Sequence, residues 1–225
     1  MLLQLKNISK SYGNLANTTR QVVLDNLSFS VNEGDTLAIL GPSGSGKSTL
    51  LNIIGTLDRP DSGNYTYKEK DITTFTDAEL DLFRNREIGF VFQFHHLLPQ
   101  CNLLENVLIP TLVDKSNKKE KFNYAEQLIN KVGLWEHRHK LPGQLSGGEC
   151  QRAAVVRAMI NRPSLILADE PTGALDRKNV DKMSDLLLQL NSEQKATLIL
   201  VTHSRSLASK METVYAIMEG KLQQQ

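Results

Sequence analysis

The strongest constraint on this chain is a glycine-rich stretch that follows a short apolar run. The run extends from Thr36 to Leu40, and the stretch after it reads Gly41-Pro42-Ser43-Gly44-Ser45-Gly46-Lys47-Ser48-Thr49. With this spacing the backbone N–H groups can turn inward around a phosphate, Lys47 can reach the β- and γ-phosphate oxygens, and the Ser48 hydroxyl can bind Mg²⁺. An apolar helical pattern follows. The stretch therefore predicts a site for a nucleotide with at least two phosphates, rather than a flexible glycine- and serine-rich linker.

Composition narrows the kinds of protein that can carry this site. The chain has 225 residues with 40% hydrophobic content, which suits a compact α/β domain. Its 26 basic and 25 acidic residues leave a net charge of +1, so a nucleic-acid partner is not expected. No apolar run approaches the ~20 residues of a membrane span, and no signal-peptide pattern is found, which predicts a cytosolic chain. Cys101 and Cys150 lack metal-site spacing and are expected to be reduced and structural.

Before the phosphate loop, the sequence alternates as an antiparallel sheet does. The stretch from Val22 to Val31 is predicted to be a half-exposed strand beside a first strand from Leu2 to Ile8, because apolar and polar residues alternate from Asn26 to Val31. Tyr12 lies between them, in Ser11-Tyr12-Gly13. Spacing alone favours a surface turn for this tyrosine, although its ring could stack on a purine.

After the phosphate loop the pattern changes twice. A hairpin is expected through Tyr65, Tyr67 and Ile72, followed by a short capped helix to about Arg86. From Phe94 to about Ile160 the sequence pattern is typical of helices, so residues 94–160 are the candidate for a separate subdomain.

Four apolar runs end at residues that can take part in phosphate chemistry. They end at Gly41, at Gln93, at Asp169-Glu170 and at His203. In an open parallel sheet the ligand lies outside the carboxyl ends of the strands. The four ends would therefore deliver phosphate donors, an amide, two carboxylates and a histidine to one edge, which indicates a nucleoside-triphosphate hydrolysis site.

The residue types at these strand ends suggest individual roles. Asp169 is a hard oxygen donor suited to Mg²⁺, with a water molecule between them, and Glu170 could accept a proton from the attacking water. Gln93 could orient water or bind the metal, and His203 could donate to the γ-phosphate. Each residue also has a simpler interpretation when taken alone. The strand-end carboxylates could cap the next helix, Gln93 could be a solvated surface residue, and His203 could be a histidine whose hydrogen bonds are made within the fold. Their joint occurrence with the phosphate loop favours the catalytic roles.

A second anion-binding pattern occurs at Leu145-Ser146-Gly147-Gly148-Glu149. Ser146 is a candidate N-cap with Glu149 as its capping-box partner, at the start of a helix that continues to Ile160. Two adjacent glycines behind the cap leave backbone N–H groups bare at the positive end of a helix. One nucleotide site with two phosphate-binding segments suggests that the second segment serves the ATP of another subunit.

In this order, the phosphate loop, Gln93, the Ser146 motif, Asp169-Glu170, Ala174-Leu175-Asp176 and His203 resemble the ATPase subunits of ABC transporters. The resemblance covers essentially the whole chain. It implies one domain over residues 1–225: a RecA-like P-loop NTPase core with an antiparallel β-subdomain, and a helical subdomain inserted at 94–160.

The resemblance also implies how ATP and Mg²⁺ would be held. Two copies would form a head-to-tail dimer, each ATP lying between the phosphate loop of one copy and the Ser146 motif of the other. Tyr12 would then stack on adenine, contrary to the spacing argument. Asp176 would communicate across the dimer, and the Gln93 region would touch membrane-embedded permease subunits.

Within that family the residues from Phe92 to Pro99 and from Leu104 to Val107, together with those from Ala168 to Gly173, look like those of the lipoprotein-releasing branch. This implies a peripheral protein on the cytoplasmic face of the inner membrane, reaching lipoprotein substrates only through its partners. Macrolide or peptide exporters and a cell-division regulator that transports nothing are the alternatives, and a soluble P-loop kinase or a nucleic-acid ATPase is a more distant one. Two residues depart from the family pattern: Cys150, where Gln or Arg is usual, and Ser204, where Asp is common.

Overall fold

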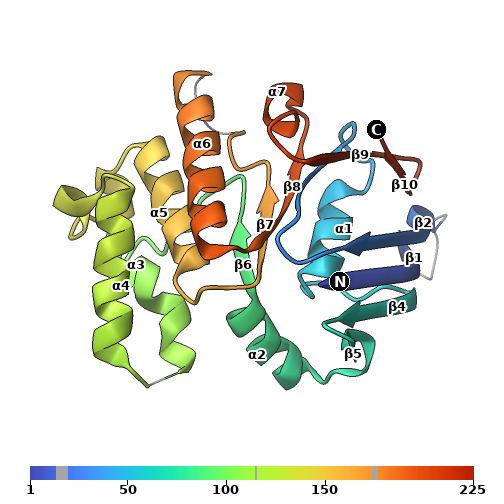
Figure 1. The fold of residues 1–225 in the computed structure, drawn as a ribbon, viewed down its shortest axis with the longest axis horizontal. Coiled ribbons are helices and arrows are strands. Elements are labelled where there is room, and N and C mark those ends of the chain that lie inside the picture. Colours follow the sequence, from blue (N-terminus) through green and yellow to red (C-terminus); the bar gives the residue numbers. More distant parts are fainter. Residues whose placement is uncertain (14–19, 115, 174–176) are drawn as a thin grey trace. The chain divides into compact units, whose positions relative to one another are not determined.

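The computed structural model describes residues 1–13, 20–114, 116–173 and 177–225. Contacts divide the chain into two compact parts. Unit 1 comprises Met1–Arg84 and Thr197–Gln225, and unit 2 comprises Asn85–Ala196. Both units combine helices with parallel strand pairs, which confirms the predicted α/β class (Figure 1).

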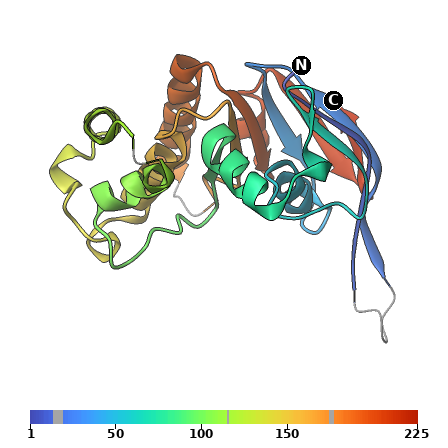
Figure 2. The same ribbon diagram turned by 90° about the horizontal axis from the view of Figure 1, so that it is seen from below.

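One sheet of unit 1 is antiparallel and has the order β2-β1-β4-β5. Its strands are β1 (Leu3–Tyr12), β2 (Gln21–Val31), β4 (Ser62–Tyr67) and β5 (Lys70–Asp71). From Asn26 to Val31 on β2 the apolar side chains are buried and the intervening polar ones are exposed, as the alternation predicts, whereas Val22 is exposed. β1 pairs with β4 only as far as Ser9, whereas its pairing with β2 continues to Tyr12. Figure 2 shows these two blue strands running on together beyond β4.

The parallel strands of unit 1 carry the phosphate-loop candidate. β3 (Thr36–Leu40) pairs in parallel with β8 (Thr197–Thr202) on one side and with β9 (Thr213–Met218) on the other. β10 (Lys221–Gln224) adds an antiparallel edge. Helix α1 (Lys47–Ile54) contacts β2 and β8 and buries Leu50, Leu51, Ile53 and Ile54. This apolar face fixes the start of the helix at the end of β3.

Two short helices complete the description of unit 1. The helix α7 (Arg205–Ala208) follows β8. The helix α2 (Asp77–Glu87) begins in unit 1 and includes the boundary between the units. It starts at a capping box, because Thr76 N–H donates to Glu79 (2.8 Å) and Glu79 N–H donates to the Thr76 hydroxyl (3.4 Å).

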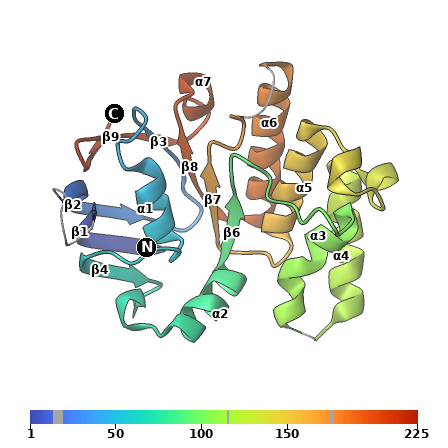
Figure 3. The ribbon, with the colours of Figure 1, turned by 180° about the vertical axis from the view of Figure 1, so that it is seen from behind.

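Unit 2 contains two parallel strands and most of the helices. β6 (Ile88–Val91) pairs with β7 (Leu165–Asp169), which is fully buried from Leu165 to Ala168. The helices α3 (Leu103–Leu108), α4 (Lys118–Lys131) and α5 (Gly147–Met159) contact one another and lie together in Figure 3. Helix α6 (Arg177–Gln194) follows β7 in the chain. Buried residues of α5, Ala153 to Val156, belong to the core of this unit.

Several expected boundaries are wrong. Ile72 does not belong to the hairpin but begins a 3-10 helix (Ile72–Thr74), whose first turn is capped by the Asp71 side chain. Residues 94–102 are not helical, and helix α3 starts only after Asn102, whose capping box with Glu105 ends the irregular segment. The helical subdomain over 94–160 stays a prediction.

Candidate functional site

The phosphate-loop candidate joins β3 to α1 in unit 1. Gly44 and Gly46 have φ of 79° and 100°, the left-handed region that favours glycine. A Cβ atom at Gly41 would lie 2.6 Å from Ser45 Oγ and 2.8 Å from the carbonyl oxygen of Ile217. Glycine is therefore required where the chain leaves β3, because the loop folds closely back onto itself.

The Lys47 side chain is bonded to the first two residues of this loop. Its Nζ donates to the carbonyl oxygens of Gly41 and Pro42, at 2.8 Å each. Ser45 Oγ is buried and has no hydrogen-bond partner among the described residues, and Ser48 is exposed at the start of α1. An ammonium held by neutral carbonyls, beside a buried hydroxyl and the first turn of a helix, suits anionic phosphate oxygens.

The surface turn favoured by spacing for Tyr12 is wrong. Tyr12 is the last residue of β1, and its hydroxyl donates to Asp58 Oδ2 at 2.7 Å. Its side chain remains available, since the residue is 44% exposed. The strand continues to this position because β2 pairs with it, a partner that local spacing does not reveal.

In unit 2 the structure brings Gln93 close to the turn that follows Asp169 and Glu170. A Cβ atom built on Gly173 would lie 3.1 Å from Gln93 Nε2 and 3.3 Å from the Glu170 carbonyl oxygen. Parallel pairing explains this proximity, because β6 and β7 end side by side with Val91 opposite Ala168. Glu170 has a φ of 45°, which is uncommon for a residue with a side chain.

The magnesium donors predicted from the sequence are divided between the units, with Ser48 in unit 1 and Gln93 and Asp169 in unit 2. Within the described ranges, His, Cys, Asp and Glu side chains do not gather in any group of three or more that could hold a metal ion. The predicted donors are of a different kind: an exposed hydroxyl (Ser48), an exposed amide (Gln93) and a half-buried carboxylate (Asp169). Such oxygen donors suit Mg²⁺, which keeps several waters and takes few ligands from the protein.

The Ser146 motif forms the N-terminus of α5 as predicted. Ser146 N–H donates to Glu149 Oε2 at 2.7 Å, and Glu149 N–H donates to the Ser146 hydroxyl at 3.3 Å. The hydrogen bonds from the Ser146 backbone and hydroxyl lower the pKa of the Glu149 carboxyl, and His137 Nδ1 lies 2.6 Å from its other oxygen. A Cβ atom on Gly147 would meet no described atom within 4 Å, so packing within this chain does not explain that glycine.

Helix α5 also holds the backbone on both sides of Gln93. Gln151 Nε2 donates to the carbonyl oxygen of Phe92 at 2.8 Å. The two terminal nitrogens of Arg157 donate to the carbonyl oxygens of His95 (2.8 Å) and His96 (2.6 Å). Sequence reasoning missed both anchors. The sequence contained a signal for Arg157 alone, as an isolated arginine in the apolar run from Ala153 to Ile160.

The remaining predicted residues lie at the ends of elements. His203 is exposed and directly follows β8. Ser204, one of the two departures from the family pattern, caps α7 by accepting from Leu207 N–H at 3.3 Å, a role that Asp could also fill. Cys150, the other departure, is buried and donates to the Pro142 carbonyl oxygen at 3.6 Å, and burial raises the pKa of its thiol. Asp176 lies outside the described residues.

Comparison with known proteins identifies the family to which these features belong. A family model described as ABC transporter matches residues 24–173. The chain belongs to the ABC transporter family. As a member of this family it is an ATP-binding ATPase subunit. Among the residues that the structure describes, no helix is long and apolar enough to span a membrane.

Full-length relatives resemble this ABC subunit closely. It is 44% identical to the lipoprotein-releasing system ATP-binding protein LolD of Geobacter metallireducens, over 98% of this chain and 97% of the relative. It is 46% identical to YvrO of Bacillus subtilis, an uncharacterized ABC transporter ATP-binding protein, over 98% of this chain and 95% of the relative. A solved dimer of the ATP-binding cassette MJ0796, bound to ADP and Pi after hydrolysis, matches with a TM-score of 0.91 and 37% identity over 100% of this chain and 98% of the other. This structural match confirms the predicted ABC ATPase fold.

Proposed function

We propose that this chain is the ATP-hydrolysing subunit of a transporter that releases lipoproteins from the inner membrane. The observation that carries the proposal is full-length similarity to relatives named for that system. Relatives from Geobacter metallireducens, Syntrophus aciditrophicus and Rickettsia bellii are 44%, 42% and 42% identical, each over 98% of this chain. Similarity over essentially the whole length suits a shared function better than a shared phosphate loop alone would.

In this proposal the phosphate loop of unit 1 binds the triphosphate. Lys47 exchanges the carbonyls of Gly41 and Pro42 for the β- and γ-phosphate oxygens, which are charged and bind an ammonium more strongly. Ser48, Gln93 and Asp169 would hold Mg²⁺, whose charge, when the ion is bound, offsets that of the phosphates.

Hydrolysis in the proposal depends on two strand ends. Glu170 accepts a proton from the attacking water, a role worth typically 10²–10⁴-fold in rate. His203 donates a hydrogen bond to the γ-phosphate. Gln93 orients groups at the same centre, and Gln151 and Arg157 keep its backbone in place from α5.

We extend the proposal to a head-to-tail dimer. The open space at Gly147 and the two glycines in the first turn of α5 support it, because both suit a ligand supplied from outside the chain. Ser146, Gly147, Gly148 and Glu149 of one copy would face the γ-phosphate bound by Lys47 of the other, and Asp176 would communicate across the interface. The relative MJ0796 has been solved as a dimer.

Permease subunits would bind unit 2, because it exposes large apolar side chains at Phe94, which directly follows Gln93, and at Leu112 and Val113. Phe94 is 65% exposed, Leu112 69% and Val113 58%. Exposed apolar residues of this size often mark protein contacts. The lipoprotein would be touched only by the permeases, and the chain would be peripheral on the cytoplasmic face of the membrane.

A second candidate is kept because YvrO, a relative of similar identity, is not named for lipoprotein release. Because this relative is 46% identical and uncharacterized, the same cassette could serve an exporter of a macrolide or peptide, or a cell-division regulator. In either case the ATP chemistry is unchanged and only the membrane partner differs.

The two candidates are separated by a release assay. The chain is depleted from its source cells, and spheroplasts are tested for release of a newly made, labelled lipoprotein. Wild-type chain should restore release, whereas Lys47→Ala, which removes the phosphate-binding ammonium, should not. Release that continues at the normal rate after depletion would rule out the lipoprotein function. Unchanged ATP affinity of Lys47→Ala would instead rule out the proposed phosphate site.

A further inference from the structure

The aromatic ring of Tyr12 is held by a charged pair that the ATPase site does not account for. Tyr12 Oη donates to Asp58 Oδ2 at 2.7 Å, and Lys10 Nζ donates to Asp58 Oδ1 at 2.6 Å. Lys10 and Asp58 are largely shielded, with side-chain exposures of 12% and 28%. The carboxylate therefore connects the aromatic hydroxyl to a lysine two residues earlier on the same strand.

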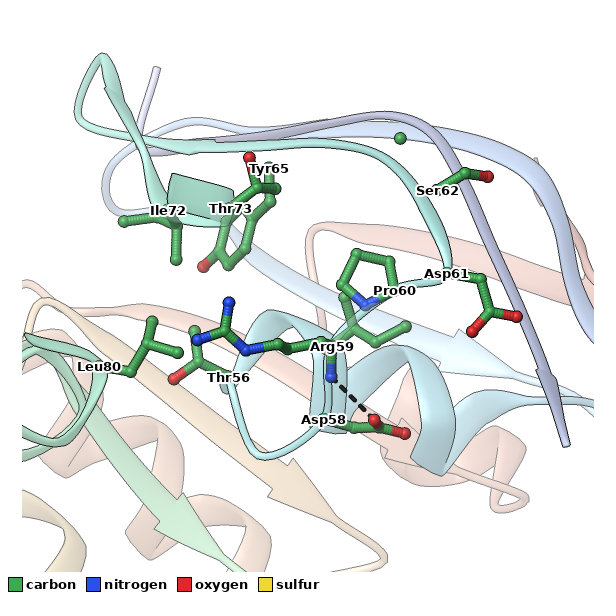
Figure 4. Close-up of a pocket in the computed structure, with 12 residues that line it drawn as sticks. Thr56, Asp58, Arg59, Pro60, Asp61, Ser62, Tyr65, Ile72, Thr73 and Leu80 are labelled. Carbon is green, nitrogen blue, oxygen red and sulfur yellow. Dashed lines mark hydrogen bonds between the residues drawn. The ribbon is translucent and has the colours of Figure 1, made fainter. Parts of the chain in front are cut away.

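Asp58 is itself fixed by the turn that follows α1. Its Oδ1 also accepts from the Arg59 N–H at 2.8 Å, and Lys10 Nζ donates to the Arg59 carbonyl oxygen at 2.7 Å. Figure 4 shows the Asp58 carboxylate and the Arg59 side chain leaving this turn in opposite directions, with Arg59 extending across a pocket toward Leu80. The turn thus presents Asp58 to β1 with both carboxylate oxygens used.

The lysine also restricts the ring directly. Lys10 Nζ lies 5.2 Å from the centroid of the Tyr12 ring, within the range of a cation–π contact. A cation beside one face of the ring leaves the opposite face for a stacking partner, and Tyr12 as a whole remains 44% exposed. The ring is therefore oriented before any ligand binds, and orientation in advance lowers the entropy lost on binding.

The charges at Asp58 are consistent with this arrangement. Burial raises the pKa of the Asp58 carboxyl, but the hydrogen bonds from Lys10 and Tyr12 outweigh burial and the pKa lies below its usual value. Burial and the hydrogen bond to Asp58 raise the pKa of the Tyr12 hydroxyl. At neutral pH the pair is a carboxylate acceptor and a phenol donor.

We propose that Asp58 and Lys10 are positioning residues that fix the Tyr12 ring for stacking on the base of the bound nucleotide. This inference rests on the proposed function, in which Tyr12 stacks on adenine. The two parts of the side chain then have separate roles. The ring supplies stacking, and the hydroxyl sets the angle at which the ring is presented.

The test compares ATP with tripolyphosphate, which has no base, in binding and competition measurements on the full chain. Tyr12→Ala removes the ring and should weaken ATP binding by about 10-fold or more, since base–aromatic stacking contributes about 1–3 kcal/mol. Tyr12→Phe and Asp58→Ala keep the ring and should each weaken ATP binding about 3- to 10-fold. The double variant Tyr12→Phe/Asp58→Ala should bind ATP no more weakly than Asp58→Ala alone. Tripolyphosphate affinity should be unchanged in all of them, and in turnover the KM for ATP should rise while kcat is retained.

Two matched variants control for general loss of packing. Tyr65→Phe removes a buried hydroxyl that donates to the Ile54 carbonyl oxygen at 2.9 Å, and Asp71→Asn alters a carboxylate bonded to Thr73 and Asn64. Both belong to unit 1 and should leave ATP affinity unchanged.

The outcomes separate this inference from the proposed function. If Tyr12→Ala weakens ATP binding while Tyr12→Phe and Asp58→Ala bind ATP as wild type does, the positioning role is wrong and stacking stands. If Tyr12→Ala itself binds ATP normally, Tyr12 has no place in the nucleotide site. Should Asp58→Ala fail to fold, the result with Tyr12→Phe decides, because this variant loses a single oxygen atom.

Discussion

The two hydrogen bonds from Arg157 should control how readily the segment after Gln93 opens. Arg157 donates to the carbonyl oxygens of His95 and His96, two and three residues beyond Gln93. Hydrogen bonds to a charged group contribute about 1.5–3 kcal/mol each. Burial lowers the pKa of the Arg157 guanidinium, which reflects a desolvation cost that Arg157→Met would remove. The net loss of local stability in Arg157→Met should therefore be about 2 kcal/mol.

Hydrogen exchange of the peptide covering residues 92–99 measures this loss directly. A loss of about 2 kcal/mol corresponds to roughly thirtyfold faster exchange. Arg157→Lys keeps the charge but can reach one carbonyl at most in this geometry, so it should fall between wild type and Arg157→Met. ATP turnover should decrease in the same order, because Gln93 loses its fixed position.

A matched arginine provides the control. Arg138 also donates to a main-chain carbonyl, that of Trp135, at 2.8 Å, and among the described residues this carbonyl lies outside the segment after Gln93. Arg138→Met should leave exchange at residues 92–99 unchanged. If Arg157→Met also leaves exchange there unchanged, the anchoring role of α5 is refuted.

Three further predictions concern the proposed general base Glu170, the glycines of the phosphate loop and the helix-capping residue Glu149. Glu170→Gln should retain ATP binding and lower turnover 10²- to 10⁴-fold, and a variant turning over at the wild-type rate would remove Glu170 from its role. Gly46→Ala should destabilise the protein by about 2–4 kcal/mol in urea unfolding, because the new Cβ would lie 2.9 Å from the Val23 carbonyl oxygen at a φ of 100°. Gly44→Ala, with φ 79° and no described atom within 4 Å, should cost only about 1 kcal/mol, and equal losses would contradict the clash. Because the folded-state pKa of Glu149 is lowered, its contribution to stability is complete above its usual value of 4.5 and is lost as the pH falls through the lower folded value. Acid titration of unfolding should therefore show a smaller loss for Glu149→Gln than for wild type, and equal losses would contradict this linkage.

The sequence predicted the elements whose signals are local. β3 was predicted with its observed bounds, because it is a continuous apolar run whose central residues, Leu37 to Ile39, are buried. The helix caps at Thr76 and Ser146 were also predicted, since a cap needs only a residue and its partner three positions later. Failures came where a distant partner decided. The first strand was predicted only from Leu2 to Ile8, but β1 continues to Tyr12 because β2 pairs with it, and no local pattern reveals that partner.

The candidate site divides in the same way. The sequence by itself determined the chemistry, because a phosphate loop, a strand-end Asp-Glu pair and a glycine-rich helix N-terminus act through backbone and side-chain groups at fixed spacing. Only the tertiary structure decided what holds these groups in position: Asp58 on the Tyr12 hydroxyl, and Arg157 on the backbone after Gln93. In each case the partners are far apart in the chain, by 46 residues for Tyr12 and Asp58 and by 62 for Arg157 and His95. A hydrogen bond over such a separation is specified by packing rather than by local pattern.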